Sequence, residues 1–161
     1  MKVYITYFRY DRDENYEIYR VDLNRQSSVK DYKENQLPNF LGYGPDDVSY
    51  LILKEVDLTP SEYSELLRLS KKTNDYDRET IDFMIDIHDG DGEEIFFDSG
   101  DTIWEVLDFF IDSGVFDLES ILMIDEEDYD DDELRELCQE KLFEDDDLFD
   151  FVLKTYIQKC Y

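Results

Sequence analysis

The sequence predicts an α+β fold: an N-terminal antiparallel β-sheet with one packed helix, then a helical C-terminal part that carries an acidic face. Residues 2–10 and 16–23 are rich in β-branched and aromatic side chains and flank a polar turn, which favours a hairpin. Residues 48–58 form an apolar run typical of a buried strand. The last 60 or so residues instead place apolar side chains at helical spacing. We therefore expect strands early and helices late.

Between the second and third strands the sequence is polar and then rich in turn-forming residues. A short helix around residues 28–34 is expected. Residues 37–47 contain Pro38, Gly42, Gly44 and Pro45, which favours a loop. The chain is expected to form a single compact domain, 1–161, and this loop is the candidate boundary between sub-lobes 1–44 and 45–161.

A helix start and a second hairpin are expected after the third strand. Thr59, Pro60 and Glu62 have the pattern of a capping box with proline at the first helical position, so a helix should run to about residue 72. Residues 81–88 alternate, with isoleucine or phenylalanine on one side and Asp82, Met84, Asp86 and His88 on the other, which predicts a strand. The Asp-Gly-Asp-Gly of residues 89–92 is a hairpin turn signal, and residues 94–98 are expected to return.

The remaining residues favour helices separated by short acidic segments. Asp101 or Thr102 is expected to cap a helix to about Asp112, which Ser113 and Gly114 would end. Residues 116–124 could form a helical turn or a strand, and 125–132 an acidic connection. The last two helices are expected over 133–143 and 147–157.

Charge is the most unusual property of the chain. It carries 44 acidic and 16 basic residues, for a formal net charge of −28, and residues 81–161 hold 28 of the acids with only four bases. The acids are interleaved with apolar side chains, so a disordered acidic tail is a poor interpretation. Such a surface repels nucleic acid and anionic lipid, and a basic nucleic-acid-binding protein is the partner that it fits.

Acids recur at offsets of three and four residues in the two strongest helical segments, which places each set on one helix face. The expected partner-binding residues of the first helix are Asp101, Glu105, Asp108 and Asp112, and those of the second are Glu133, Glu136, Glu140 and Glu144. Asp82 and Asp86 are added from the polar side of the expected strand 81–88, beside Glu94 and Asp98 if that hairpin pairs.

Two interpretations of these acidic rows remain open. They could be the solvated face of an acidic protein, or they could replace the phosphates of a nucleic acid. Carboxylates one helical turn apart stand about 5–6 Å from each other, which is comparable with the phosphates of one DNA strand, whose rise is about 3.4 Å per nucleotide. Tyrosines of the first hairpin, Tyr4, Tyr7, Tyr10, Tyr16 and Tyr19, are either core residues or partner contacts.

Catalytic, cofactor and metal sites are not expected. His88 is the only histidine, and no serine or cysteine nucleophile accompanies a base and an orienting acid. An EF-hand register on Gly92 puts Ile87 at the first ligand position, so the acidic loops are not a calcium site of that kind. Two cysteines, Cys138 and Cys160, give no disulfide framework, and the N-terminus lacks a signal-peptide pattern, so a cytoplasmic protein is expected.

The chain resembles the acidic DNA-mimic inhibitors of mobile elements, such as antirestriction proteins of the ArdA type and several anti-CRISPR proteins. The resemblance rests on small size, the opening strand with Val3, Tyr4 and Ile5, and carboxylate rows on helices. It implies binding to the DNA-contact groove of a host defence nuclease. The leading hypothesis is thus a non-enzymatic inhibitor; the alternatives are an immunity protein against a cationic toxin, or an acidic adaptor or calcium-binding module.

Overall fold

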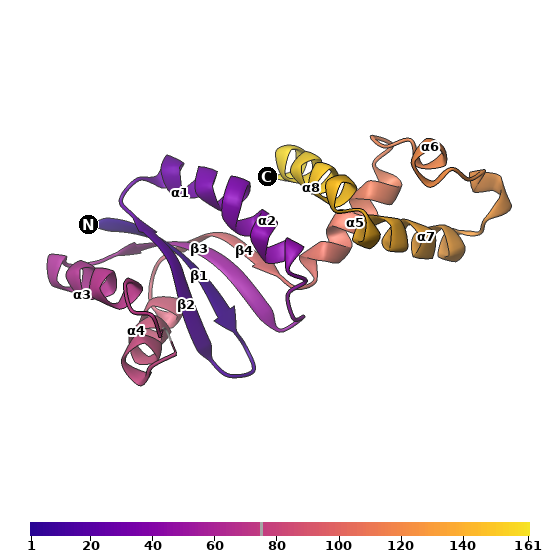
Figure 1. Cartoon of the computed structure of the whole chain (residues 1–161). Coiled ribbons are helices and arrows are strands. Elements are labelled where there is room, and N and C mark those ends of the chain that lie inside the picture. The colour runs from indigo at the N-terminus through magenta and orange to yellow at the C-terminus, as the bar shows by residue number, and fades with distance from the viewer. Residues whose placement is uncertain (75) are drawn as a thin grey trace. The chain divides into compact units, whose positions relative to one another are not determined.

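An antiparallel sheet occupies the first part of the chain and helices the last, so the expected α+β class is confirmed (Figure 1). The computed structural model describes residues 1–74 and 76–161. The chain divides into two units, Met1–Gly100 and Asp101–Tyr161. The expected sub-lobe boundary at residues 44 and 45 does not divide the structure, because strands on either side of it are hydrogen-bonded along their whole length.

The first unit is built on a four-stranded sheet with the order β2-β1-β3-β4, in which all neighbours are antiparallel. Its strands are β1 (Lys2–Tyr10), β2 (Asn15–Asp22), β3 (Ser49–Asp57) and β4 (Glu93–Ser99). The first three agree closely with the expected ranges. Residues 3–8 of β1 and 51–56 of β3 are continuously buried, because helices cover both faces of the sheet (Figure 1).

A β-bulge at Tyr19 changes the alternation of β2. Between consecutive residues of β1 the pairing partner jumps from Arg20 to Ile18, which leaves Tyr19 unpaired. Val21 therefore joins Ile18 in the core. Arg20 directly follows the bulge and reaches the other face of the sheet, where it pairs with Asp31 at 3.2 Å.

One face of the sheet is covered by a continuous helical segment. It consists of α1 (Arg25–Asp31), the π-helical turn η1 (Tyr32–Gln36) and α2 (Leu37–Gly42). The buried Tyr32 hydroxyl lies 2.5 Å from the Asp98 carboxylate and 3.0 Å from the Leu51 carbonyl, and its one proton can be donated to either acceptor, which ties this segment to β3 and β4. The expected loop over 37–47 is therefore wrong for residues 37–42. Pro38 lies in the first turn of α2, where proline is tolerated.

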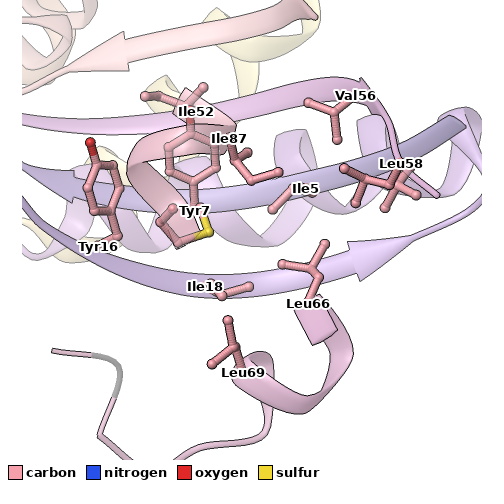
Figure 2. Close-up of a cluster of buried hydrophobic side chains, with 12 residues drawn as sticks. Ile5, Tyr7, Tyr16, Ile18, Ile52, Val56, Leu58, Leu66, Leu69 and Ile87 are labelled. Carbon is pink, nitrogen blue, oxygen red and sulfur yellow. The ribbon is translucent and has the colours of Figure 1, made fainter. Parts of the chain in front are cut away.

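The other face of the sheet carries α3 (Pro60–Ser70) and α4 (Arg78–Asp89). The capping box expected at Thr59 and Glu62 is confirmed. Figure 2 shows the core that forms between these helices and the sheet. Its buried members are Val3, Ile5, Tyr7, Tyr16, Ile18, Ile52, Val56, Leu58, Leu66, Leu69, Met84 and Ile87. Each large side chain buried here contributes about 1.5–3 kcal/mol to stability.

Residues 81–88 form most of α4, so the expected strand there is wrong. The buried positions are Thr80, Met84 and Ile87, at offsets of four and three, which is the helical period. Asp77 caps the helix by accepting a hydrogen bond from the Thr80 amide. The second expected hairpin is wrong for the same reason. Residues 89–92 connect α4 to β4, and β4 pairs with β3.

Lys54 of β3 anchors the C-terminal end of α4. Its side chain is only 3% exposed, and its ammonium donates to the carbonyl oxygens of Ile87, His88 and Gly90, each at 2.9 Å. Helix C-terminal carbonyls lack partners within the helix and carry partial negative charge. The buried ammonium of Lys54 therefore has three hydrogen-bond acceptors, and it caps the C-terminal end of α4.

The second unit is helical. Its elements are α5 (Thr102–Asp112), α6 (Leu118–Leu122), the 3₁₀ turn η2 (Glu126–Asp128), α7 (Asp131–Glu144) and α8 (Asp146–Cys160). The three helices expected at 101–112, 133–143 and 147–157 are confirmed, and residues 116–124 take the helical alternative. Packing of α5, α7 and α8 on one another buries Val106, Leu107, Phe110, Cys138, Leu142, Val152 and Leu153.

Candidate functional site

The acidic row of α7 lies on the solvent side of its helix. Glu133, Glu136, Glu140 and Glu144 are all exposed, while Cys138 and Leu142 are buried on the side that packs in the unit. The row covers three turns, about 16 Å at 1.5 Å per residue. The expected placement of these four carboxylates on one accessible face is therefore confirmed.

The acidic row of α5 is partly used inside the unit. Asp108 pairs with Arg135 of α7 at 2.7 Å, and Glu105 accepts a hydrogen bond of 3.0 Å from the Tyr156 hydroxyl of α8. The two end members, Asp101 and Asp112, are exposed. The sequence could not reveal these uses, because they join residues 27 and 51 positions apart. Asp101, Glu105, Asp108 and Asp112 thus do not form four equally available carboxylates.

Asp82 and Asp86 lie one turn apart on the exposed side of α4, in the first unit. Their expected position on a strand beside Glu94 and Asp98 is wrong. Asp82 pairs with Arg78 at 3.0 Å, whereas Asp86 makes no ion pair with any residue that the structure describes. Asp86 is therefore the more available of the two.

Many other acids of the second unit have a structural explanation. Asp117, Asp125, Asp130 and Asp145 each cap a helix by accepting a backbone N–H. Asp130 and Glu133 form a reciprocal capping box. The hydroxyl and amide of Ser120 hold the pKa of Asp117 below its usual value. Acids in a first helical turn are also favoured by the helix dipole.

Glu136, Glu140 and Glu144 have no such explanation. Within the described part of the chain they make no ion pair and no side-chain hydrogen bond. They repel one another at one-turn spacing, and Glu140 and Glu144 lie at the C-terminal end of α7, where the helix dipole disfavours negative charge. These three carboxylates therefore lower the stability of the folded protein, and they are accessible to a cationic partner.

The two units differ in how their charge is balanced. In the first unit, 23 acids face 12 bases, and most of these bases contact carboxylates, as Arg68 does with Glu65 and Glu79. The second unit has 21 acids and four bases. Arg135, Lys141 and Lys154 are each paired within that unit. The uncompensated charge is therefore concentrated in residues 101–161.

His88 lies in an aromatic environment of the first unit. The Tyr7 hydroxyl is 2.7 Å from His88 Nδ1, and the rings of Tyr7 and Tyr16 each lie 5.8 Å from the imidazole. Burial, with Arg9 nearby, lowers the pKa of His88, and burial raises that of Tyr7 well above its usual value. Tyr7 and Tyr16 are core residues, so the cluster holds α4 against the hairpin.

Among the residues that the structure describes, no three histidine, cysteine or acidic side chains are grouped so as to hold a metal ion. Nor does any described helix have the length and apolar character needed to cross a membrane. No family model, curated protein or solved structure matches the chain, so its candidate site rests on the geometry and charge described above.

Proposed function

We propose that this protein is a non-enzymatic inhibitor that binds the basic nucleic-acid site of a host defence nuclease, such as a restriction enzyme or a CRISPR effector. The observation that carries the proposal is the exposed, unpaired row Glu136, Glu140 and Glu144 on α7. These residues lower the stability of the free protein and make no ion pair or side-chain hydrogen bond within the part of it that the structure describes. A contact with a partner protein is the best explanation for them.

The physical basis is competition for the same positive charges. A groove that binds DNA presents lysine and arginine to phosphates, and a row of carboxylates at one-turn spacing offers those bases similar partners. Complementary charge mainly accelerates encounter, whereas specificity comes from acids held in register by the helix. The acids of the neighbouring turns, including Asp131, Asp132 and Asp128, extend the negative field. The site of action would be the host cytoplasm.

The test is a competition assay with purified nucleases of these classes. Increasing amounts of the protein should displace labelled DNA, and a higher DNA concentration should restore binding. The variant E136Q/E140Q/E144Q should compete less well. A matched control, D13N/E34Q/D91N, removes three exposed acids of the first unit that form no ion pair among the described residues.

Loss of competition in the α7 variant, with the control unaffected, supports the proposal. An equal loss of competition in both variants would show that the inhibition depends on net charge alone and not on the α7 row. No competition with any DNA-binding nuclease would overturn the proposal, and neutralisation of a cationic nuclease toxin instead would favour an immunity function.

A further inference from the structure

An aromatic cavity of about 290 Å³ lies beside the first hairpin, within the first unit. Its walls come from β1, β2, α2 and the loop that leads into β3. Its lining residues are Phe8, Tyr10, Tyr19, Phe40, Tyr43, Pro45, Asp46 and Ser49. Five of these eight are aromatic and one is a carboxylate, so the cavity combines ring faces with a negative charge.

The aromatic floor is fixed by ring-to-ring packing. Phe8 and Phe40 are buried, and the Phe8 ring lies 4.3 Å from Tyr10 and 5.5 Å from Phe40, in edge-on arrangements. Tyr19, which alternates with the core residue Ile18, lies on this same face, 6.3 Å from Phe8. The hairpin tyrosines are therefore divided between the two faces of the sheet. Tyr10 and Tyr19 lie here, while Tyr7 and Tyr16 lie in the opposite core.

Tyr43 stands at the rim and is 89% exposed. It follows α2 and lies between Gly42 and Gly44, and the second of these has a left-handed φ of 62°. So large an apolar ring in solvent has no role in the core. It is placed to cover a side chain that enters the cavity.

Asp46 contributes a negative charge to the cavity wall, and its position is fixed by hydrogen bonds. Its carboxylate accepts a hydrogen bond from the Val48 amide, and its carbonyl accepts one from Ser49. A Cβ on Gly100 would come within 2.5 Å of the Asp46 carbonyl oxygen, so the two backbones are in close contact. Arg12 already places a guanidinium nitrogen 3.5 Å from Asp46, and both side chains are exposed.

We infer that this cavity is an anchor site for one arginine side chain of a partner protein. Ring faces attract a planar guanidinium, which stacks on tyrosine more readily than an ammonium does. The carboxylate of Asp46 completes the site by a charge-assisted hydrogen bond. No basic residue lines the cavity, and Arg12 at its edge shows that this carboxylate accepts a guanidinium. The inference concerns a different surface from α7 and does not rest on the proposed function.

The probe is the tripeptide acetyl-Gly-Arg-Gly-amide, titrated into the isotope-labelled protein at about 0.15 M salt, where long-range attraction is screened. Saturable amide shifts should be confined to the cavity, at Gly42, Gly44 and Ser49. The dissociation constant should be on the order of millimolar, as befits a single side chain. The lysine peptide should bind several-fold more weakly, and the leucine peptide should not saturate.

Three matched pairs of variants locate the contact. Tyr43→Ala should weaken binding about two- to fivefold, whereas Tyr129→Ala in the second unit should not. Asp46→Asn keeps the oxygen that accepts from Val48 and should weaken binding, whereas the neighbouring Asp47→Asn should not. Arg12→Gln removes the resident competitor and should strengthen binding, whereas Arg78→Gln should leave it unchanged.

Shifts spread over the acidic surface, or equal effects of Asp46→Asn and Asp47→Asn, would overturn the inference, because they indicate attraction without a site. Equal binding of the leucine peptide would do the same, since the cavity would then be a general apolar anchor. Competition with DNA by α7 is measured separately, so either result can fail without the other.

Discussion

The Tyr7 hydroxyl lies 2.7 Å from His88 Nδ1, and this contact joins β1 to the last turn of α4. Because burial lowers the pKa of His88, the folded state favours the neutral ring that can accept this hydrogen bond. The charges of Arg9 and Lys54 also lower this pKa, whereas those of Asp89 and Glu94 raise it.

The first prediction concerns pH. A histidine with a lowered pKa contributes stability that is full above its unfolded value, about 6.5, and is lost as the pH falls through the folded value. His88→Leu should therefore cost about 1–3 kcal/mol at pH 7.5, because the buried Tyr7 hydroxyl loses its partner. The cost should shrink by pH 5.5 in urea unfolding. A cost independent of pH would show that His88 is not held neutral.

The second prediction concerns Lys54. Replacing it by methionine keeps the volume but removes the donor for three carbonyls, so Lys54→Met should lower the free energy of unfolding by about 2–3 kcal/mol. Lys71→Met, at an exposed position, should change it by less than about 0.5 kcal/mol. Urea unfolding followed by circular dichroism measures both. Similar losses in the two variants would contradict the anchoring role of Lys54.

The third prediction concerns salt. Screening weakens repulsion among the 21 acids of residues 101–161, so the melting temperature should rise between about 20 mM and 500 mM NaCl. Calorimetry can follow the transition at each concentration. A flat or falling curve would mean that the acids are compensated within the fold, and the electrostatic basis of the proposed inhibition would be lost.

The fourth prediction links stability to binding through α7. E136Q/E140Q/E144Q should stabilise the free protein by about 0.5–1.5 kcal/mol, because it removes repulsion and an unfavourable dipole interaction. The same variant should bind a basic target about 3- to 160-fold more weakly, at about 0.2–1 kcal/mol for each of the three exposed contacts. Thermal unfolding and calorimetric titration give the two values. A variant that gains stability and keeps its affinity would exclude this row from the interface.

Local signals explain which parts of the fold could be predicted. The capping box at Thr59 and the acids of α7 lie within a few residues of the structure that they specify, and both were placed correctly. Residues 81–88 satisfy the strand and the helix period at once. The deciding signal is the cap at Asp77, which lies outside the alternating run. Pro38 favours a loop by its residue type, although its position in a first helical turn permits a helix.

The candidate site was predictable only where it depends on one helix. The α7 row follows from spacing alone. By contrast, the engagement of Asp108 by Arg135 and the cavity around Tyr19 depend on packing between elements that are far apart in the sequence. No local pattern encodes such contacts. The sequence therefore identified the acidic surface but neither its internal ion pair nor the aromatic cavity.

The outer face of α7 has one more consequence. Glu136, Glu140 and Glu144 on this face make no ion pair or side-chain hydrogen bond within the described chain, whereas the inner face of the same helix is fixed by Cys138 and Leu142. Under the proposed function, folding and recognition would therefore draw on separate residues. Substitutions at Glu136, Glu140 and Glu144 would then change the partner without unfolding the protein, and these three positions are where a new specificity could be engineered.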